Sequence, residues 1–526
     1  MINRLGETSI QREFEADIAI IGAGAMGLAI ASEFLHTGFS ILLLESGLAD
    51  SNCVSDTLLA VENIGHKFNG ATSSGRRRVL GGATTLWGGQ FLPLGDIVFT
   101  ERPWLGVSGW PFQKTLLKPF YKRAADLAQL KLATGGDSLW IGHGINPPLF
   151  NPEKLKSEFS SWSPRPNFAN NMRGDLALSS NVEVLLDATV TEILINRHGE
   201  VQELSIRSTL GHAAMAKARF YILAAGAIES ARLLLASRRQ DDRGIGNSNG
   251  LVGRYFQDHI SLPVARIIPK NRATFHQIYD NFIVGGTKYA PKVVISDALQ
   301  RENRILNVGG FFRFSVDNSI SINALKTLIG HLKRRTIPSD GIPLLAKSII
   351  NLPEVAKFAY GVRIKHRIQA SREGEIFLEA HSEQLPRPES RISLSKKDDR
   401  LGMPLACLNW RIADESRMAI KAYTNTVRDE FHRLCLADVE PLSDVIDSPY
   451  EFQRSLSDVY HQMGTLRMST NPEEGVTNPD ARMHEVPNLY VAGCSLFPVS
   501  GYSNPTHTGI ALAVRLADHL KSRLSK

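Results

Sequence analysis

The segment from Asp17 to Glu45 constrains the fold most, because it forms one continuous strand–turn–helix–strand pattern. The β-branched run DIAIIG predicts a buried strand over residues 17–22. LAIASEFLHTG predicts a helix that ends at Gly38, and SILLLE predicts a second strand over residues 40–45. Such a unit is typical of an α/β domain built on a parallel sheet.

Three glycines, Gly22, Gly24 and Gly27, occupy the predicted turn in G-x-G-x-x-G spacing. They permit a tight turn, a close approach of the backbone to a pyrophosphate, and close packing of helix on strand. The start of the helix adds N–H groups and a positive dipole for phosphates. At the end of the second strand, Glu45 can accept hydrogen bonds from a ribose diol. The unit predicts dinucleotide binding and leaves NAD and FAD open; the alternative is a glycine-rich turn in an ordinary α/β unit.

A second glycine-rich segment, RVLGGATTLWGGQFLP, spans residues 78–93 and has two glycine pairs on either side of Trp87. Because glycine removes the side chain where a backbone must come close, this segment could pass along a flat cofactor. An elaborate turn is the alternative interpretation.

Further segments predict that the dinucleotide domain is interrupted along the chain. Residues 182–208 show β-branched alternation broken at His198-Gly199, which indicates strand pairs. Residues 218–237 predict a strand, a glycine turn and a helix that return to the first sheet. Between these elements, residues 116–130 predict an amphipathic helix.

The resulting fold class is α/β: a discontinuous Rossmann-like domain with an inserted substrate domain built on an antiparallel sheet plus helices. Strand-like runs in the inserted part cover 288–295, 309–316, 375–379 and 391–395. We expect the dinucleotide domain over residues 1–103, 182–264 and 446–526, and the substrate domain over 104–181 and 265–445.

A basic, helical tract from Ile320 to Arg367 has two interpretations. It could dock on a membrane or a partner, but a solvated basic face is favoured. The whole chain has 60 basic and 53 acidic residues, a mild excess that could favour anionic ligands or surfaces. A solvated basic surface is favoured, and we expect no nucleic-acid partner.

Composition also bears on compartment and metal binding. The cysteines, Cys53, Cys407, Cys435 and Cys494, lie far apart and show no metal-ligand spacing, so we expect no metal and a reducing, cytoplasmic environment. The N-terminus shows no apolar signal region, and glycines and polar residues break the longest apolar stretch, so no membrane span is expected.

Two segments near the C-terminus carry candidate chemistry. VYHQMGTLRM places His461 just before a glycine-containing turn. In NLYVAGCSLFPVSGYSNPTHTGIALAVRLADHL, a strand ends in Gly493 and a helix is predicted to open at Asn504-Pro505. Asparagine is a strong N-cap and proline is preferred at the first helical position, so Asn504 is expected to cap this helix.

With these segments in view, the chain resembles the glucose–methanol–choline (GMC) oxidoreductases, flavoenzymes that oxidise alcohols. The resemblance covers about half of the residues, chiefly the flavin domain, whereas the part from about 265 to 445 matches only by its place in the order. The matching pieces, in the family's order, are GAGAMG with Glu45, RVLGGATTLWGG, YILAAGAIESARLLLAS, GLVGRYFQDH, YHQMGTLRM and NPTHTGIALAVRLADHL.

The resemblance implies FAD as the cofactor. Some family members attach flavin covalently through a histidine, and Leu86 stands at the position that we align with it, which implies non-covalent FAD here. The residues implied to bind the cofactor are Gly22, Gly24, Gly27, Glu45, Gly81, Gly82, Thr85, Val190, Ala225, Gly493 and Thr506.

Within the family, the C-terminus looks most like the pyranose 2-oxidase branch and its bacterial relatives. That resemblance implies a catalytic pair of His461 and Asn504, the latter in an N-P-T stretch. Other branches use two histidines as the catalytic pair, so His507 is the alternative to Asn504 as the second residue of that pair. We favour Asn504, with His507 as a substrate-side residue.

The resemblance implies oxidation of a CH–OH group, with a sugar or glycoside as the favoured substrate. His461 would take the hydroxyl proton while the carbon gives hydride to the flavin. The flavin would pass its electrons to O₂ or to a quinone- or dye-like acceptor. Two alternatives stay open: a flavin-dependent lyase or isomerase on the same fold, and a non-catalytic flavoprotein that docks through the basic tract.

Overall fold

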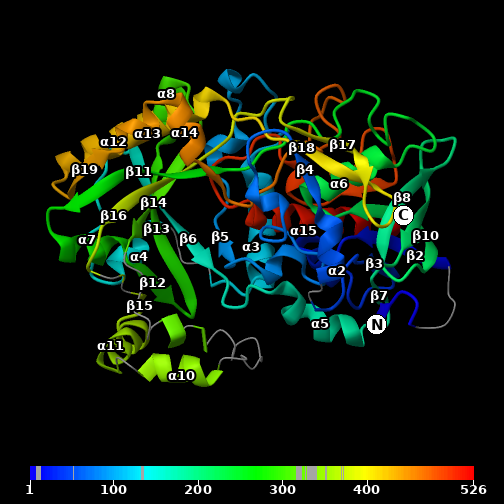
Figure 1. Ribbon diagram of the computed structural model, residues 1–526, viewed down its shortest axis with the longest axis horizontal. Helices are drawn as coiled ribbons and strands as arrows, with labels where there is room; N and C mark the ends of the chain where they lie inside the picture. The colour runs from blue at the N-terminus through cyan, green and yellow to red at the C-terminus, as the bar shows by residue number, and fades with distance from the viewer. Residues whose placement is uncertain are drawn as a thin grey trace.

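The computed structural model describes residues 1–7, 13–50, 53–131, 136–315, 323–325, 327–328, 341–349, 352–368, 370 and 372–526. Figure 1 shows two halves side by side, each built around a sheet, with both chain termini in the same half. The fold class predicted from the sequence is confirmed: one half is a mainly parallel α/β unit and the other rests on an antiparallel sheet.

The first sheet grows from the predicted strand–turn–helix–strand unit. β2 (Glu13–Ile21) pairs in parallel with β3 (Ile41–Leu44) on one side and with β10 (Ala213–Leu223) on the other. Its apolar end is fully buried, which explains the short β-branched run. The remaining strands are β1 (Ile2–Arg4), β7 (Val182–Leu186), β8 (Thr189–Ile195), β9 (Val201–Arg207) and β21 (Leu489–Val491). The order is β1-β7-β3-β2-β10-β9-β8, with β21 beside β10.

Helices pack on this sheet and against one another. α1 (Ala25–Glu33) packs against α5 (Phe168–Leu178) and α15 (Thr506–Leu524), and α15 also packs on α3 (Lys118–Leu127). α3 is the helix that was predicted over residues 116–130, and it is shorter than expected. It ends because Gln129 takes a left-handed conformation with φ +54°, which terminates a helix.

The second sheet is antiparallel and forms the other half of the molecule in Figure 1. Its order is β15-β12-β13-β14-β16-β11-β19, with β6 beside β13, β5 beside β6 and β20 beside β11. α12 (Asp414–Arg433) packs against this sheet. The strands are β5 (Gln90–Phe91), β6 (Leu155–Trp162), β11 (Ile260–Pro269), β12 (Asn281–Val284), β13 (Thr287–Ile295), β14 (Val308–Phe314), β15 (Arg367–Ile368), β16 (Ile376–Ser382), β19 (Ala437–Pro441) and β20 (Ser457–Asp458).

A small third sheet lies next to the first half. β17 (Arg391–Asp398) pairs with β18 (Pro404–Asn409), which pairs in parallel with β4 (Val61–Asn63). α6 (Gly226–Ala236) packs against both β17 and β18. These strands therefore pack on the cofactor side, although they belong to the stretch expected to form the substrate domain. The domain bounds stay a proposal.

The remaining described helices are short or peripheral: α2 (Cys53–Asp56), α4 (Ser138–Ile141), α7 (Arg272–Tyr279), α8 (Asp297–Asn303), α10 (Gly341–Ile349), α11 (Leu352–Arg363), α13 (Ser443–Ile446) and α14 (Pro449–Ser455). Among the described residues, none of the helices has the length and apolar character needed to cross a bilayer. Within that same part of the chain, no cluster of three or more His, Cys, Asp or Glu side chains suits a metal ion. Cys407, Cys435 and Cys494 are free thiols.

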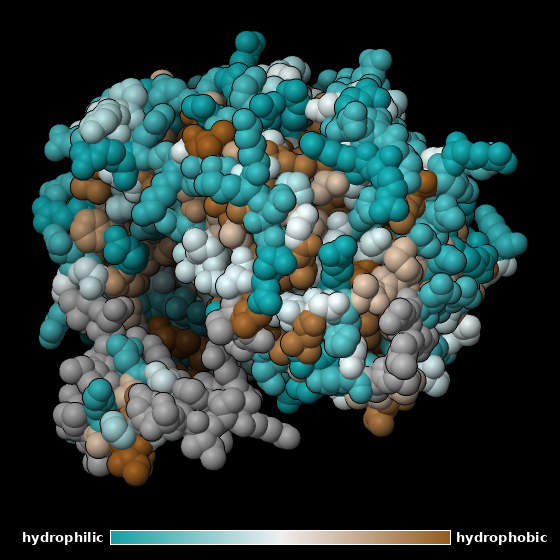
Figure 2. All heavy atoms as spheres, turned by 45° about the vertical axis from the view of Figure 1, so that its right-hand side comes forward, coloured by the Kyte–Doolittle hydropathy of each residue, from teal (hydrophilic) through white to brown (hydrophobic). Residues whose placement is uncertain are grey.

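The expected basic tract over 320–367 is described only in part. Its described residues include α10 and α11, and Lys347, Arg363 and Lys365 are exposed. The face shown in Figure 2 is mostly hydrophilic with scattered apolar side chains. Docking through the tract stays a prediction. Lys326, His331, Lys333, Arg334 and Arg335 lie outside the described residues.

Candidate active site

The predicted glycine turn between β2 and α1 has the geometry that a dinucleotide requires. Gly22 has φ +106°, and a Cβ there would lie 2.8 Å from the carbonyl oxygen of Ala224. A Cβ on Gly27 would lie 2.0 Å from the carbonyl oxygen of Gly22, so only glycine lets α1 pack this closely. Gly24 lines the pocket and has no atom within 4 Å of an added Cβ, so that space is open to a ligand.

Glu45 lies at the end of β3, as predicted, and its carboxylate faces the turn. Oε2 accepts from the backbone N–H of Ala23 at 2.9 Å, and Oε1 accepts from Gly47 N–H at 2.8 Å. Burial raises the pKa of Glu45, although these two N–H donors oppose the shift. Because each carboxylate oxygen has a second lone pair, the side chain can still accept from a ribose hydroxyl.

The second glycine-rich segment lies directly against the first. Gly81 N–H donates to the carbonyl of Ala23 at 2.9 Å, and a Cβ on Gly82 would lie 3.1 Å from Gly24 Cα. Leu86 and Trp87, which follow, line the pocket. The segment therefore packs against the glycine turn, and its contact with a flat cofactor stays a prediction.

Thr85 is not among the residues that line the pocket; Thr84 is. A 3₁₀ turn over Gly82–Thr85 accounts for the difference, since Thr85 Oγ1 folds back and donates to the carbonyl of Gly82 at 2.9 Å. Gly27 and Gly81 also lie behind the wall rather than in it, and contribute through packing.

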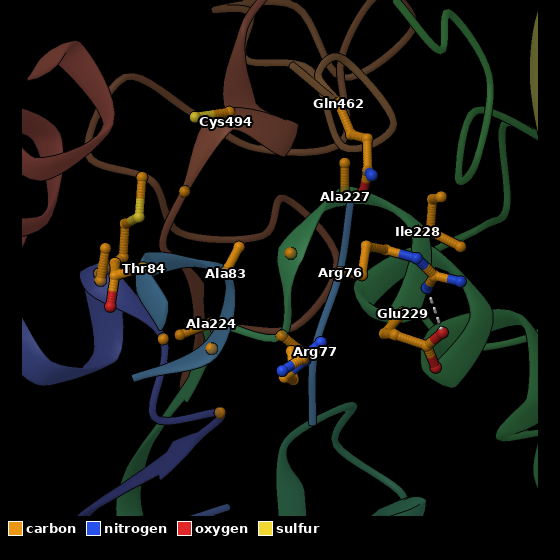
Figure 3. A pocket seen from close by; sticks show the side chains of 18 of the residues that line it. Arg76, Arg77, Ala83, Thr84, Ala224, Ala227, Ile228, Glu229, Gln462 and Cys494 are labelled. Carbon is orange, nitrogen blue, oxygen red and sulfur yellow. Dashed lines mark hydrogen bonds and ion pairs between the residues drawn. The ribbon is translucent and has the colours of Figure 1, made fainter. Parts of the chain in front are cut away.

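One cavity of about 620 Å³ joins the glycine turns to the C-terminal segments. Figure 3 shows its walls: the Arg76–Thr84 stretch, the start of α6, and the loops that carry Gln462 and Cys494. Of the residues implied to bind FAD, Gly22, Gly24, Glu45, Gly82, Val190, Ala225, Gly493 and Thr506 line it. No atom lies within 4 Å of a Cβ added at Gly493, or at Gly226, a further wall position. A cradle this long, bordered by bare backbone, fits a flavin dinucleotide.

An ion-pair cluster at the cavity wall was not predicted. Glu229 in α6 binds Arg76 at 2.7 Å, Arg78 at 2.8 Å and Arg232 at 3.1 Å, and the first of these pairs is drawn in Figure 3. Burial alone would raise the pKa of Glu229, but the arginines lower it to about 2. Two of its members, Arg76 and Arg78, belong to the run of arginines over 76–78, which was the sequence signal for this cluster.

His461 is held at the cavity by its backbone. Its N–H donates to the carboxylate of Asp258 at 3.0 Å and 3.1 Å. Tyr460, which precedes it and also lines the cavity, has φ +65°, a strained conformation for a tyrosine. Such strain is commonly found where a side chain must be aimed at a site.

Asn504 contacts His461 directly. Asn504 Nδ2 lies 3.2 Å from His461 Nε2, and both residues line the cavity. The predicted N-cap role is wrong: α15 begins at Thr506, Pro505 occupies the N-cap position, and no side chain caps the helix. The reason is that the Asn504 side chain is turned onto the histidine ring.

The start of α15 forms part of the same wall. Pro505 and Thr506 line the cavity, and Gly509 N–H donates to the carbonyl of Pro505 at 2.9 Å. Because the first N–H groups of a helix carry partial positive charge, this end of α15 favours negative charge in the cavity.

The surroundings of His461 keep its ring neutral. Burial lowers its pKa well below the usual value, and His259, His381 and Lys292 lower it further. Burial also lowers the pKa of Lys292 to about 8. A neutral imidazole has one nitrogen with a free lone pair and can accept a proton.

His507 does not reach the cavity. It is 1% exposed and packs edge-on against Phe91 and Tyr121, and its Nε2 lies 3.1 Å from the carbonyl oxygen of Tyr121. The expected substrate-side position is therefore not observed. One turn into α15, the side chain points into the core, so the rival to Asn504 is absent from this wall.

Further residues at the site were missed because no local motif marks them. Gln90, Trp162 and Gln462 line the cavity; Gln462 follows His461 in the chain, and Gln90 pairs with Trp162 between β5 and β6. Asp258 and His259 lie in the GLVGRYFQDH stretch, but nothing in their spacing links them to His461, which is about 200 residues away.

Comparisons with known proteins agree with this geometry. Two models of the GMC oxidoreductase family match the chain, over residues 170–261 and 386–513. A 2-methyl-1,2-propanediol dehydrogenase of Mycolicibacterium austroafricanum is 22% identical, covering 97% of this chain and 96% of its own. A C-glycoside 3-oxidase of Microbacterium trichothecenolyticum is 33% identical over 26% of this chain and 25% of its own. The solved structure of a formate oxidase has the same fold, with a TM-score of 0.59 at 14% identity, over 98% of this chain and 99% of that one.

The chain belongs to the GMC oxidoreductase family. It is an FAD-dependent oxidoreductase that acts on the CH–OH group of alcohols.

Proposed function

We propose that this enzyme oxidises a CH–OH group of a sugar or glycoside, with His461 as the base and Asn504 as the residue that orients the reacting oxygen. The observation that carries the proposal is the contact of 3.2 Å between Asn504 Nδ2 and His461 Nε2 at the cavity wall. Two relatives, the diol dehydrogenase and the C-glycoside oxidase described above, support a polyol-like substrate.

FAD, when bound, supplies the acceptor for the hydride that leaves the substrate carbon. A substrate hydroxyl can accept a hydrogen bond from Asn504 Nδ2 and donate one to His461 Nε2, in place of their direct contact. As hydride leaves, the lone pair of Nε2 takes the hydroxyl proton. The start of α15 stabilises the negative charge that develops beside it.

The polar wall suits a hydroxyl-rich substrate. Gln462 Nε2 donates to the carbonyl of Gly70 at 2.9 Å, and Gln90 Nε2 donates to Ser160 Oγ at 2.8 Å, so both amides are held in place. Their carbonyl oxygens can accept hydrogen bonds from hydroxyl groups. Trp162 adds an apolar face of the kind that packs on a sugar ring.

Non-covalent FAD is the first prediction. Leucine has no nucleophilic atom, and Leu86 occupies the wall position aligned with the histidine that carries flavin in other family members. Purified protein should be yellow and should release FAD into the supernatant on acid precipitation. Flavin that stays in the pellet would contradict the proposal.

Glu45→Ala should weaken FAD binding by about 10-fold or more, because a hydrogen bond to a charged acceptor contributes roughly 1.5–3 kcal/mol. The change also frees the N–H groups of Ala23 and Gly47. The measurement is flavin occupancy after dialysis, titrated back with FAD. The matched control is Glu15→Ala, which removes an exposed carboxylate from β2, the strand that leads into the glycine turn. This variant should keep full flavin occupancy. Equal occupancy in both variants would remove Glu45 from the site.

The substrate class is tested with a panel of sugars, glycosides and small alcohols, each assayed with O₂ and with a quinone or dye as acceptor. We expect turnover of at least one sugar or glycoside, with the carbonyl product identified by mass spectrometry. Turnover confined to simple alcohols would overturn the sugar assignment but leave the oxidation chemistry intact. The acceptor that supports turnover identifies the enzyme as an oxidase or a dehydrogenase.

We also propose that the protein is located in the cytoplasm. The free thiols of Cys407, Cys435 and Cys494 are consistent with a reducing compartment.

A further inference from the structure

A second histidine lies behind the proposed base. His259 Nδ1 is 2.9 Å from His461 Nδ1, and the two rings are nearly perpendicular, with centroids 5.0 Å apart and an interplanar angle of 79°. A distance of 2.9 Å between ring nitrogens requires an N–H on one and a lone pair on the other. The contact therefore couples the tautomers of the two rings, because only one of the two Nδ1 atoms can carry a proton.

Asn504 decides the direction of that hydrogen bond. Its Nδ2 group carries hydrogens and can only donate, so His461 Nε2 accepts with its lone pair. The proton of neutral His461 is then on Nδ1, where it is donated to His259 Nδ1. One amide and one imidazole thus select the same tautomer from opposite sides of the ring.

His259 is suited to remain the acceptor. It is fully buried, and burial lowers its pKa to about 4, so the ring stays neutral above that pH. Its Nε2 has no hydrogen-bond partner among the described residues, and the backbone of Ser500 and Gly501 raises the pKa of the ring, which favours a proton on it. A proton on Nε2 leaves Nδ1 with the lone pair that His461 requires.

The backbone holds the two rings in register. One carboxylate, that of Asp258, accepts from His259 N–H at 2.6 Å and from His461 N–H at 3.0 Å. The pair therefore sits on a common anchor, although its members are far apart in sequence. The other charged or titratable groups that influence the pair are Asp458, Glu383, His381 and Lys292.

We propose that His259 is a positioning residue that holds the proton of neutral His461 on Nδ1, so that Nε2 keeps its lone pair for the substrate hydroxyl. This inference rests on the proposed role of His461 as the base. Without such an acceptor, a histidine ring in water favours the tautomer protonated on Nε2, which cannot take a proton there. When the hydroxyl proton moves to Nε2, both ring nitrogens of His461 carry protons and the Nδ1–H···Nδ1 bond is kept, so no proton need pass to His259.

The direct test is ¹⁵N NMR of the holoenzyme labelled in histidine, with His461→Asn used to assign the signals. In the wild type we expect His461 Nδ1 to be protonated and Nε2 to be unprotonated, with a scalar coupling between the two Nδ1 atoms across the hydrogen bond. His259→Leu should lose the coupling and populate the tautomer protonated on Nε2, because the Asn504 amide alone then opposes it. His381→Leu, which removes a neighbouring ring that makes no hydrogen bond to the pair, should leave the tautomer unchanged. A wild-type His461 protonated on Nε2 would overturn the proposal.

Kinetics gives a second, independent readout. His259→Leu should slow the limiting rate of flavin reduction by about 10-fold or more, a part of the ~10²–10⁴-fold that a positioned acid–base group contributes, with little change in KM. His259→Asn should recover much of that rate, because the asparagine oxygen can accept near the position of Nδ1. Equal rates in both variants would contradict a role for the acceptor.

The two proposals can fail separately. If His461→Ala reduces flavin at the wild-type rate, the function assigned to His461 is wrong, whereas the NMR result still decides the tautomer. If His259→Leu does not fold, His259→Asn and the wild-type spectrum carry the test.

Discussion

Replacing His461 by alanine is expected to slow reduction of the bound flavin by at least ~10²-fold, the usual contribution of a positioned acid–base group. The variant removes the only proposed acceptor for the hydroxyl proton but no residue of the glycine turns, so FAD should stay bound. Anaerobic stopped-flow mixing with a saturating substrate, followed by flavin absorbance, measures the rate.

The matched control is His198→Ala, an exposed histidine in the turn between β8 and β9. It should reduce flavin at the wild-type rate. A His461→Ala enzyme that is equally fast would remove His461 from the mechanism, and loss of FAD from that variant would point to a structural role instead.

The pH dependence of the same rate follows from the direction of the pKa shift. The pKa of His461 lies well below the usual value for histidine, chiefly through burial, so the ring is neutral at pH 7 and stays neutral on moderate acidification. The rate of flavin reduction should therefore change little from pH 8 to about pH 6 and fall only in more acid solution. A fall centred near pH 6.5, the ordinary histidine value, would contradict this environment.

Arg102→Met is expected to give the largest loss of stability. Arg102 forms two hydrogen bonds to Glu383, at 2.6 Å and 2.7 Å, and their side chains are 1% and 0% exposed. Breaking a buried pair leaves an uncompensated charge and costs about 3–5 kcal/mol. For a chain of this length that is a fall of about 3–5 °C in Tm.

Loss of the Arg102–Glu383 ion pair should also disturb the active site. Glu383 accepts hydrogen bonds from the N–H groups of Asn307 at 3.0 Å and Gly501 at 3.1 Å, so its displacement would move these segments. Gly501 lies shortly before Asn504, so we expect slower flavin reduction together with the lower Tm. Arg219→Met, which breaks an ion pair at the surface, should cost less than about 1 kcal/mol. Equal Tm values for the two variants would contradict the account of this pair.

The sign of the pH effect on this pair can also be worked out. Burial alone would raise the pKa of Glu383, but Arg102 and two backbone N–H groups lower it overall. A depressed carboxyl pKa contributes stability above the unfolded value, and that contribution is lost as the pH falls through the folded value. The difference in Tm between Arg102→Met and the wild type should therefore be largest near neutral pH and shrink in acid.

Much of the cofactor half could be predicted because its signals are local. The β-branched strand, the three glycines and the terminal glutamate lie within thirty residues, and each has one physical task in the structure. The strand and helix over residues 218–237 could be predicted equally well, because they repeat the order of strand, glycine turn and helix. Resemblance then supplied His461 and Asn504, which the structure brings into contact.

The errors arose where a local preference was overruled by a distant partner. Asn504 has the right residue type for an N-cap, but its amide serves His461 instead. His507 lies one turn away in the same helix, yet Phe91 and Tyr121 from other parts of the chain enclose its ring. His259 went unnoticed as a site residue because only the folded chain brings it to His461.

The central claim is net oxidation of a CH–OH group, and one measurement tests it most directly. The purified yellow protein is mixed without oxygen with the best substrate of the panel, both unlabelled and deuterated at the reacting carbon, while flavin absorbance and product are followed. We predict bleaching of the flavin, one carbonyl product per flavin, and slower bleaching with the deuterated substrate. Conversion of substrate to an isomer or an elimination product with the flavin still oxidised would contradict the account and identify a lyase or isomerase on this fold.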